Sequence, residues 1–243
     1  MAGGNVSNRT HSQDEETHDF LPRGEVSGRT RSATMNYKIT FPAVLLSLGI
    51  LNGCGAARPS KFYELTAPDN STVGADPARY PVTLLLGRMA TSNLYLDDRI
   101  VYTSSGQAMG KYEYQRWAEP PPEMITNILL RELRASDRYR QIYSLGSNVR
   151  GDYLLRGHLY DFREIDGKVL LARVAFDFEL DKSKTGAIVW TRYYSHDEPV
   201  DGKDVAAVVA AIDRNVQSGL TEIIGGLDEY FSKQMADALL ARH

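Results

Sequence analysis

Cysteine is the rarest residue in this 243-residue chain, in which Cys54 is the only one. A single thiol excludes an intramolecular disulfide and a metal site built from several thiolates. We therefore expect neither a disulfide framework nor a metal centre.

An excess of charge of one sign is also missing. The chain has 28 Lys and Arg against 31 Asp and Glu, a net charge of −3, and no basic patch stands out. Nucleic-acid-binding domains carry a basic stripe or face. We therefore expect no nucleic-acid partner.

Catalytic signatures are absent as well. The sequence contains no GxSxG, HExxH, Walker A or GxGxxG motif. Of the five histidines, only His158 and His196 lie away from the polar N-terminal stretch and the last position. Ser195-His196-Asp197 resembles a catalytic triad only on paper, because consecutive strand residues point to opposite faces. From the sequence we therefore expect a protein that is not an enzyme and has neither catalytic residues nor a cofactor.

A long apolar run is missing too, but a short one precedes the cysteine. It spans roughly a dozen residues up to Leu51, against about 20 for a bilayer-spanning helix. Met35 to Lys38 form a short basic start, and Gly53 places a small side chain before Cys54. This order predicts a lipoprotein signal peptide over residues 35–53 and lipidation of Cys54. The alternative is a buried cysteine after an apolar core segment.

Residues 1–34 do not fit a signal peptide. They are polar, with one isolated apolar pair at Phe20-Leu21, so we expect this extension to be disordered. One interpretation is that translation starts at Met35. The other is an unusually long n-region.

The chain after Cys54 predicts a tether over residues 54–60 and one domain over residues 61–243. Amphipathic helices are expected over residues 123–135 and from Val205 onward, with Gly225-Gly226 kinking or splitting the second. Alternation and turn residues predict strands near residues 61–65, 82–87, 111–117, 139–143, 153–162, 169–180 and 188–194. The predicted fold is α/β, or α+β in detail. It has a mixed, largely antiparallel sheet, with a central helix and a long C-terminal helix packed on it.

Two short segments hold the remaining candidate residues. Asp97-Asp98 indicates either a turn or a cation site, with the turn favoured. The next segment is rich in aromatic and arginine side chains, which dominate protein interfaces. The alternative, compatible with an interface, is that Trp117 fills the core while Arg116 and Glu119 hold the bend into the next helix. The candidate interface residues are Arg99, Tyr102, Tyr112, Tyr114, Arg116, Trp117 and Glu119.

With these motifs the chain resembles the ABC-type transport auxiliary lipoproteins, the PqiC/YmbA-like family. The resemblance also includes the strand containing Gly157 and the long C-terminal helix. Its sequence motifs are Cys54, Phe62-Tyr63-Glu64-Leu65, Arg99-Ile100-Val101-Tyr102 and Arg116-Trp117-Ala118-Glu119-Pro120.

This resemblance implies a fold like the N-terminal domain of TolB and a place on the outer membrane, anchored by lipid and facing the periplasm. Gly55 after the cysteine, in place of Asp, also favours the outer membrane. The implied partner is a periplasmic protein with a mammalian-cell-entry (MCE) domain, part of an ABC transporter that moves lipids or hydrophobic molecules between the two membranes. Self-association into a homo-oligomer is a further expectation.

Two other functions compete with this one. The first is an envelope scaffolding lipoprotein that binds peptidoglycan or an outer-membrane protein and has no transport role. The second is a periplasmic hydrolase, against which the missing pair of nucleophile and base counts.

Overall fold

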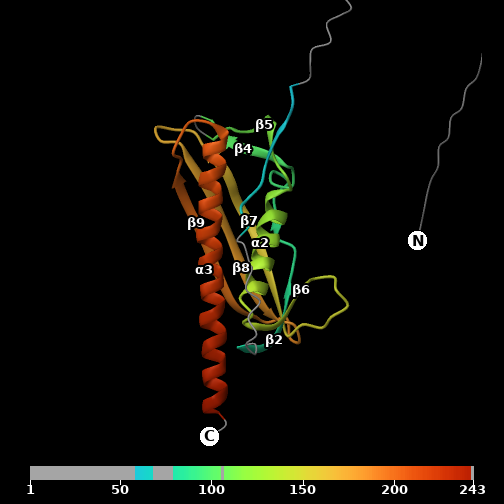
Figure 1. The fold of residues 1–243 in the computed structure, drawn as a ribbon. Helices are drawn as coiled ribbons and strands as arrows, with labels where there is room; N and C mark the ends of the chain where they lie inside the picture. Colours follow the sequence, from blue (N-terminus) through green and yellow to red (C-terminus); the bar gives the residue numbers. More distant parts are fainter. Residues whose placement is uncertain (1–57, 68–78, 105–106, 242–243) are drawn as a thin grey trace, which may run out of the picture. The chain divides into compact units, whose positions relative to one another are not determined.

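The computed structural model describes residues 58–67, 79–104 and 107–241. The chain divides into two units, Met1–Ala56 and Ala57–His243, and the description concerns the second. The predicted extension over residues 1–34, the signal peptide over residues 35–53 and Cys54 all lie outside the described residues. Element labels follow Figure 1.

The centre of the fold is a meander of three long antiparallel strands. These are β7 (Tyr153–Ile165), β8 (Leu171–Lys182) and β9 (Ile188–Pro199). The pairing of β7 with β8 runs from Tyr153↔Lys182 to Ile165↔Leu171, and β9 follows β8 along its other edge. Gly186, in the turn between β8 and β9, has φ +67°, a left-handed conformation that favours glycine. The meander that alternation predicted is confirmed.

Six shorter strands complete the sheet on the other side of β7. Three of them, β2, β3 and β4, pair in parallel with successive parts of β7, near its start, middle and end. Outside them, β6 pairs with β2, β5 pairs with β4, and β1 pairs with β5. Their bounds are β1 Lys61–Tyr63, β2 Tyr80–Leu86, β3 Ala90–Thr91, β4 Arg99–Thr103, β5 Met109–Trp117 and β6 Tyr139–Ser144. The sheet is mixed, and its longest pairings are antiparallel.

The central helix, α2 (Pro121–Ala135), begins with prolines in its first turn, where the missing N–H groups need no partner. Met124, Ile125, Ile128, Leu129 and Leu133 recur at helical spacing and are buried. The predicted helix over residues 123–135 is confirmed, with a start two residues earlier.

The C-terminal helix, α3 (Val205–Leu240), begins at Asp204, whose carboxylate accepts a hydrogen bond from the Ala207 N–H at 2.9 Å. It continues through Gly225-Gly226 as one helix, so the predicted split is wrong. A Cβ on Gly226 would lie only 3.0 Å from the Trp190 ring, so this glycine allows close packing on β9. Tertiary packing of the apolar face outweighs the poor helix propensity of the pair.

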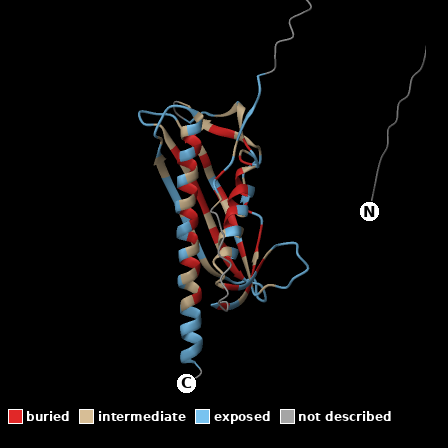
Figure 2. Cartoon of the chain, viewed as in Figure 1, coloured by how far each residue is buried: buried red, intermediate tan, exposed pale blue. Residues whose placement is uncertain are grey.

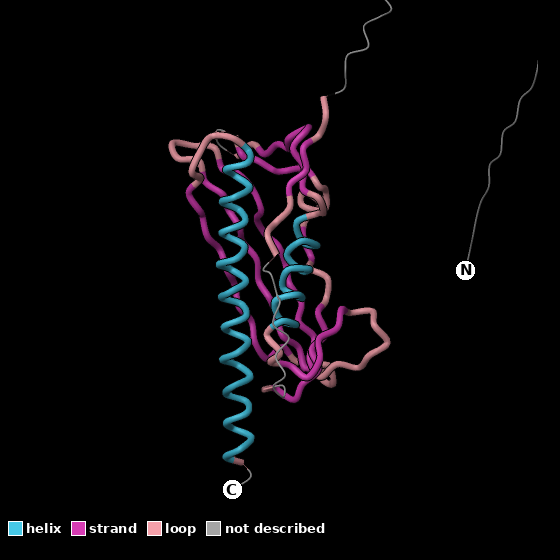
Figure 3. Tube along the Cα trace, in the orientation of Figure 1, coloured by secondary structure: helices cyan, strands magenta, loops and turns pink. Residues whose placement is uncertain are grey.

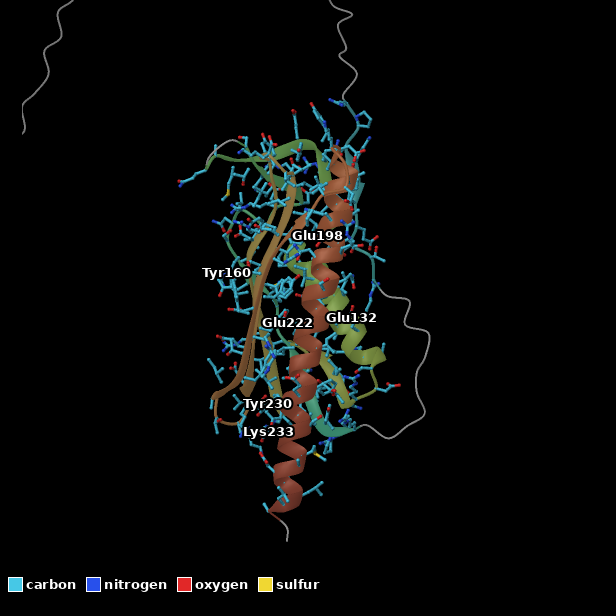
Figure 4. The ribbon with its side chains drawn as sticks, turned by 90° about the vertical axis from the view of Figure 1, so that its left-hand side faces the viewer. Glu132, Tyr160, Glu198, Glu222, Tyr230 and Lys233 are labelled. Atoms are coloured by element: carbon cyan, nitrogen blue, oxygen red, sulfur yellow. The ribbon has the colours of Figure 1, made fainter. Side chains whose placement is uncertain are left out.

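Among the residues that the structure describes, both helices pack on one face of the sheet and no helix packs on the other (Figure 4). The buried residues gather between the helices and the sheet, whereas the far end of α3 is exposed (Figure 2). Figure 3 shows the same two layers in the path of the chain. The predicted α/β fold with a mixed sheet is confirmed. Neither of these helices has the length and apolar character needed to cross a membrane.

Candidate functional site

The triad-like run lies along β9, and its members point to opposite faces. Asp197 lies on the face without helices, where Arg173 donates two hydrogen bonds of 2.6 Å to it. The neighbouring residue, His196, is next to α3, where its backbone carbonyl accepts a hydrogen bond from the Asn215 side chain. The His196 ring lies 3.4 Å from Glu198, on the helix side. The three residues therefore cannot relay a proton together.

The acidic turn before β4 is occupied by cations of the protein itself. Asp97 accepts hydrogen bonds from Arg99 Nη2 at 2.7 Å and from Lys111 Nζ at 3.1 Å. Asp98 accepts one from Arg116 Nη1 at 2.7 Å. The hydrogen bonds from Arg99 hold the pKa of Asp97 well below its ordinary value of 3.8. The turn interpretation fits this arrangement. In the part of the chain that the structure describes, no group of three His, Cys, Asp or Glu side chains could hold a metal ion.

The segment from Arg116 to Glu119 carries the chain from β5 into α2. Trp117 is 1% exposed, and its ring meets Phe162 edge-on at 5.2 Å between centroids. The backbone N–H of Trp117 donates to the backbone carbonyl of Asp98 at 2.6 Å. Glu119 accepts a hydrogen bond from the Asn127 side chain on α2 at 3.0 Å. Trp117 is thus a core residue whose side chain is closed to a partner, while Arg116 and Glu119 hold the bend.

Two of the candidate tyrosines form a half-buried pair. The ring centroids of Tyr102 and Tyr112 lie 4.8 Å apart, and the Tyr112 hydroxyl donates to Glu164 at 2.9 Å. Burial raises the pKa of both Tyr112 and Glu164. The Tyr102 ring also covers Gly110, where an added Cβ would approach within 2.5 Å. These contacts shape the β4–β5 hairpin, and the Tyr112 hydroxyl is already engaged by Glu164.

Tyr114 lies between Tyr112 and Arg116 on β5, beside the segment where the chain joins the domain. The guanidinium of Arg58 is 5.7 Å from the centre of its ring. Sequence reasoning assigned Arg58 only to the tether, and the signal that it missed is the short distance along the chain to Cys54.

The structure therefore divides the seven candidates. Arg99 and Arg116 are partners across β4 and β5 and form one surface patch with Asp97 and Asp98. Glu119 is exposed at the start of α2. We name Arg99, Arg116 and Glu119 the exposed patch. Of the other four, Tyr102, Tyr112 and Trp117 support the fold, and Tyr114 lies by the tether.

Comparison with known families matches residues 63–224 to the model of a family described as "ABC-type transport auxiliary lipoprotein component". The match runs from the end of β1 into α3. No curated protein sequence matches the chain.

Solved structures share the fold at low sequence identity. A Xanthomonas campestris protein of family DUF330 is 19% identical, with a TM-score of 0.63 over 73% of this chain and 99% of that one. An uncharacterized protein is 12% identical, with a TM-score of 0.54 over 68% of this chain and 97% of that one. At these identities the likeness shows the architecture alone.

Proposed function

Because this chain belongs to the family of ABC-type transport auxiliary lipoprotein components, we propose that it is the lipid-anchored, periplasm-facing auxiliary subunit of such a transporter. In this role it binds the MCE-domain periplasmic component and helps to move lipids or other hydrophobic molecules between the inner and outer membranes. It acts by docking, without catalysing a reaction.

Cys54 supplies the anchor in this proposal. The short apolar run, the basic start and Gly53 favour cleavage before the cysteine and transfer of acyl chains to it. Each buried methylene contributes about 0.8 kcal/mol, so more than one chain holds the protein stably on a bilayer. Gly55 after the cysteine favours the outer membrane. The family match together with this lipidation signal is the observation that carries the proposal.

The exposed patch is the proposed docking surface for the MCE-domain protein. Arg99 and Arg116 are held in place by carboxylates and still leave 41% and 31% of their side chains exposed. Arginine fixed in this way loses little conformational entropy when it binds a partner. The same surface is open to a second copy of the chain, which is the form that self-association would take.

The anchor is tested by intact-mass analysis of the protein purified from its native membranes. We expect a chain that begins at Cys54 and carries acyl chains, in the outer-membrane fraction. A bare thiol on an uncleaved chain would remove the basis of the proposal.

The docking role is tested by measuring the affinity of the lipidated protein for the cognate MCE-domain protein, and its uptake of labelled phospholipid. Arg99→Ala should weaken the complex about tenfold, as loss of an interface arginine does. Arg214→Ala is the matched control, since Arg214 is 46% exposed and, like Arg99, is paired with carboxylates, those of Glu198 and Asp201. Binding of neither the protein nor the phospholipid would favour the scaffolding role instead.

A further inference from the structure

The corner where the chain joins the domain carries exposed aromatic and basic side chains. Phe62, on the edge strand β1, is 63% exposed. It pairs with Arg116, two residues beyond Tyr114 on β5, so Phe62 and Tyr114 share one face of this strand pair. Arg58 lies over the Tyr114 ring, and Lys61 is exposed beside them. We name these four residues, Arg58, Lys61, Phe62 and Tyr114, the tether corner.

Covalent geometry limits how far this corner can lie from Cys54. Four peptide units separate Cys54 from Arg58, and a fully extended chain spans at most about 14 Å over that length. The polar headgroup region on each side of a bilayer is about 6 Å thick. If lipids hold Cys54 at the membrane, Arg58 therefore lies at or close to the headgroups in any conformation of the tether.

The chemistry of the corner suits that location. Aromatic side chains concentrate at the membrane–water interface, and cationic side chains are attracted to anionic headgroups. The neighbouring cations Arg99, Lys111 and Arg116 are paired with Asp97 or Asp98, but no ion pair among the described residues involves Arg58 or Lys61. Two exposed acidic residues, Glu64 and Glu113, are also close along the chain.

The corner is also fixed to the rest of the domain. The Ala118 N–H donates to the Tyr63 carbonyl at 2.7 Å. The Thr66 N–H donates to Asp213 on α3 at 2.9 Å, and Gln217 donates back to the Thr66 carbonyl at 2.6 Å. The chain joins the domain at the end opposite the last turn of α3 (Figure 1). The direction of the corner therefore sets the direction of the whole helix.

We propose that the tether corner lies in the headgroup layer of the membrane that holds Cys54, with Phe62 and Tyr114 as interfacial anchors and Arg58 and Lys61 against lipid phosphates. The last turn of α3 then points away from that membrane. This orientation rests on the proposed lipidation of Cys54. It assigns Tyr114 to the lipid surface, and the exposed patch that binds the protein partner then borders the membrane, since Phe62 pairs with Arg116.

Site-specific labelling tests the orientation on the full lipoprotein. Lipidation would consume the thiol of the only native cysteine, so one introduced cysteine is the single reactive thiol. Phe62→Cys and Met235→Cys place a polarity-sensitive fluorophore at opposite ends of the domain, at side chains that are 63% and 37% exposed. Both proteins are reconstituted in vesicles of phosphatidylethanolamine and phosphatidylglycerol that contain a headgroup-level quencher.

We expect the label at residue 62 to be quenched at least about threefold more strongly than the label at residue 235, because only the first lies at the interface. Equal quenching, with lipidation of the same sample verified by mass, would overturn the orientation and leave the proposed function intact. An unlipidated chain that stays out of the membrane fraction would overturn both.

A charge-reversal pair checks the contribution of the basic residues. Arg58→Glu with Lys61→Glu, added to the Phe62→Cys protein, should lower the quenching in phosphatidylglycerol vesicles at least about twofold. The matched control is Lys233→Glu, at an exposed lysine near the other end of α3. An equal effect of the control, or no effect of the double variant, would overturn the assignment of Arg58 and Lys61.

Discussion

The same strands build two unlike faces of the sheet. On the face toward α3, Val174, Phe176, Phe178 and Leu180 of β8 are buried at 1% exposure or less. On the opposite face, the intervening residues Arg173, Asp177 and Glu179 lie among charged and aromatic neighbours without a covering helix. The alternation of a strand thus separates the two tasks, because one set of side chains holds the fold and the other meets its surroundings.

Side-chain contacts order the open face, although no element of the described part of the chain covers it. Arg173 donates two hydrogen bonds to Asp197. The Tyr160 hydroxyl donates to Asp177 at 2.7 Å, and this hydrogen bond raises the pKa of Tyr160 to about 12. His158 stacks on Tyr160 at 4.4 Å between ring centroids. Exposed ion pairs of this kind contribute at most about 1 kcal/mol each. The covered face should therefore dominate the free energy of unfolding, and the following substitutions test that comparison.

The largest effect is expected from Phe176→Ala. This side chain is fully buried between Phe178 and Tyr194, and its removal should lower the free energy of unfolding by about 3–5 kcal/mol. Urea denaturation measures the change. Tyr193→Ala, on the open face and 58% exposed, is the control and should cost less than about 1 kcal/mol. Similar losses at both positions would end the distinction between the faces.

A second effect comes from the glycine that lets α3 approach the sheet. A Cβ at Gly219 would lie 2.6 Å from the Phe176 ring and 2.7 Å from Tyr194, so Gly219→Val should destabilise by about 2–3 kcal/mol. Gly225→Ala meets no atom within 4 Å and should stabilise by about 0.5–1 kcal/mol. Thermal unfolding of the two variants should shift in opposite directions. A shift in the same direction would show that close packing does not explain the choice of glycine.

The buried amide of Asn215 should have the next largest effect. Its Nδ2 donates to the carbonyls of Ala172 and His196, and its Oδ1 accepts from the Tyr194 hydroxyl at 2.8 Å. Asn215→Ala removes the donor to both carbonyls, while the Tyr194 hydroxyl keeps its bond to the Asn215 backbone carbonyl at 3.1 Å, and should cost about 1–2 kcal/mol in urea denaturation. Asn127→Ala removes a single exposed hydrogen bond to Glu119 and is expected to cost much less. Equal costs would contradict the role assigned to the buried amide.

The smallest effect is expected on the open face, and it depends on pH. Hydrogen bonds from Arg173 hold the pKa of Asp197 below its ordinary value of 3.8. The stabilisation is therefore present above the unfolded-state pKa and is lost as pH falls through the lower folded-state pKa. Because each side chain is 35% exposed, Asp197→Asn should cost less than about 1 kcal/mol at neutral pH. Unfolding measured from neutral pH to below pH 3 should show this difference shrinking, and a constant difference would rule out the ion pair as its source.

Local patterns in the sequence predicted the meander and α2 because their causes are local. Alternation placed Phe176 and Phe178 on one face, and the prolines before Met124 marked a helix start. The order of β2, β3 and β4 along β7 depends on pairings between distant residues that no local pattern contains. The same holds for α3. The Gly225-Gly226 pair predicts a helix break from the sequence alone, and only the close packing of Gly226 against Trp190 explains why glycine stands there in a continuous helix.

The candidate interface was predictable only in part, for a related reason. Aromatic and arginine residues mark interfaces and cores alike, so Trp117 could be assigned to the core only once Phe162 was placed beside it. Asp97 and Asp98 could be separated from a cation site only through Lys111 and Arg116, which lie 14 and 18 residues further along the chain. The exposed patch is what remains after these contacts are known.

One consequence of α3 as an unbroken helix is mechanical. Its 36 residues form a rod of about 54 Å. The turns beyond Phe231 project past the residues that pack it against the sheet (Figure 2). Such a rod converts a small tilt at its base into a much larger sideways displacement of its tip. A partner bound to that tip would therefore be displaced by any change in the tilt of the domain, as the end of a lever is.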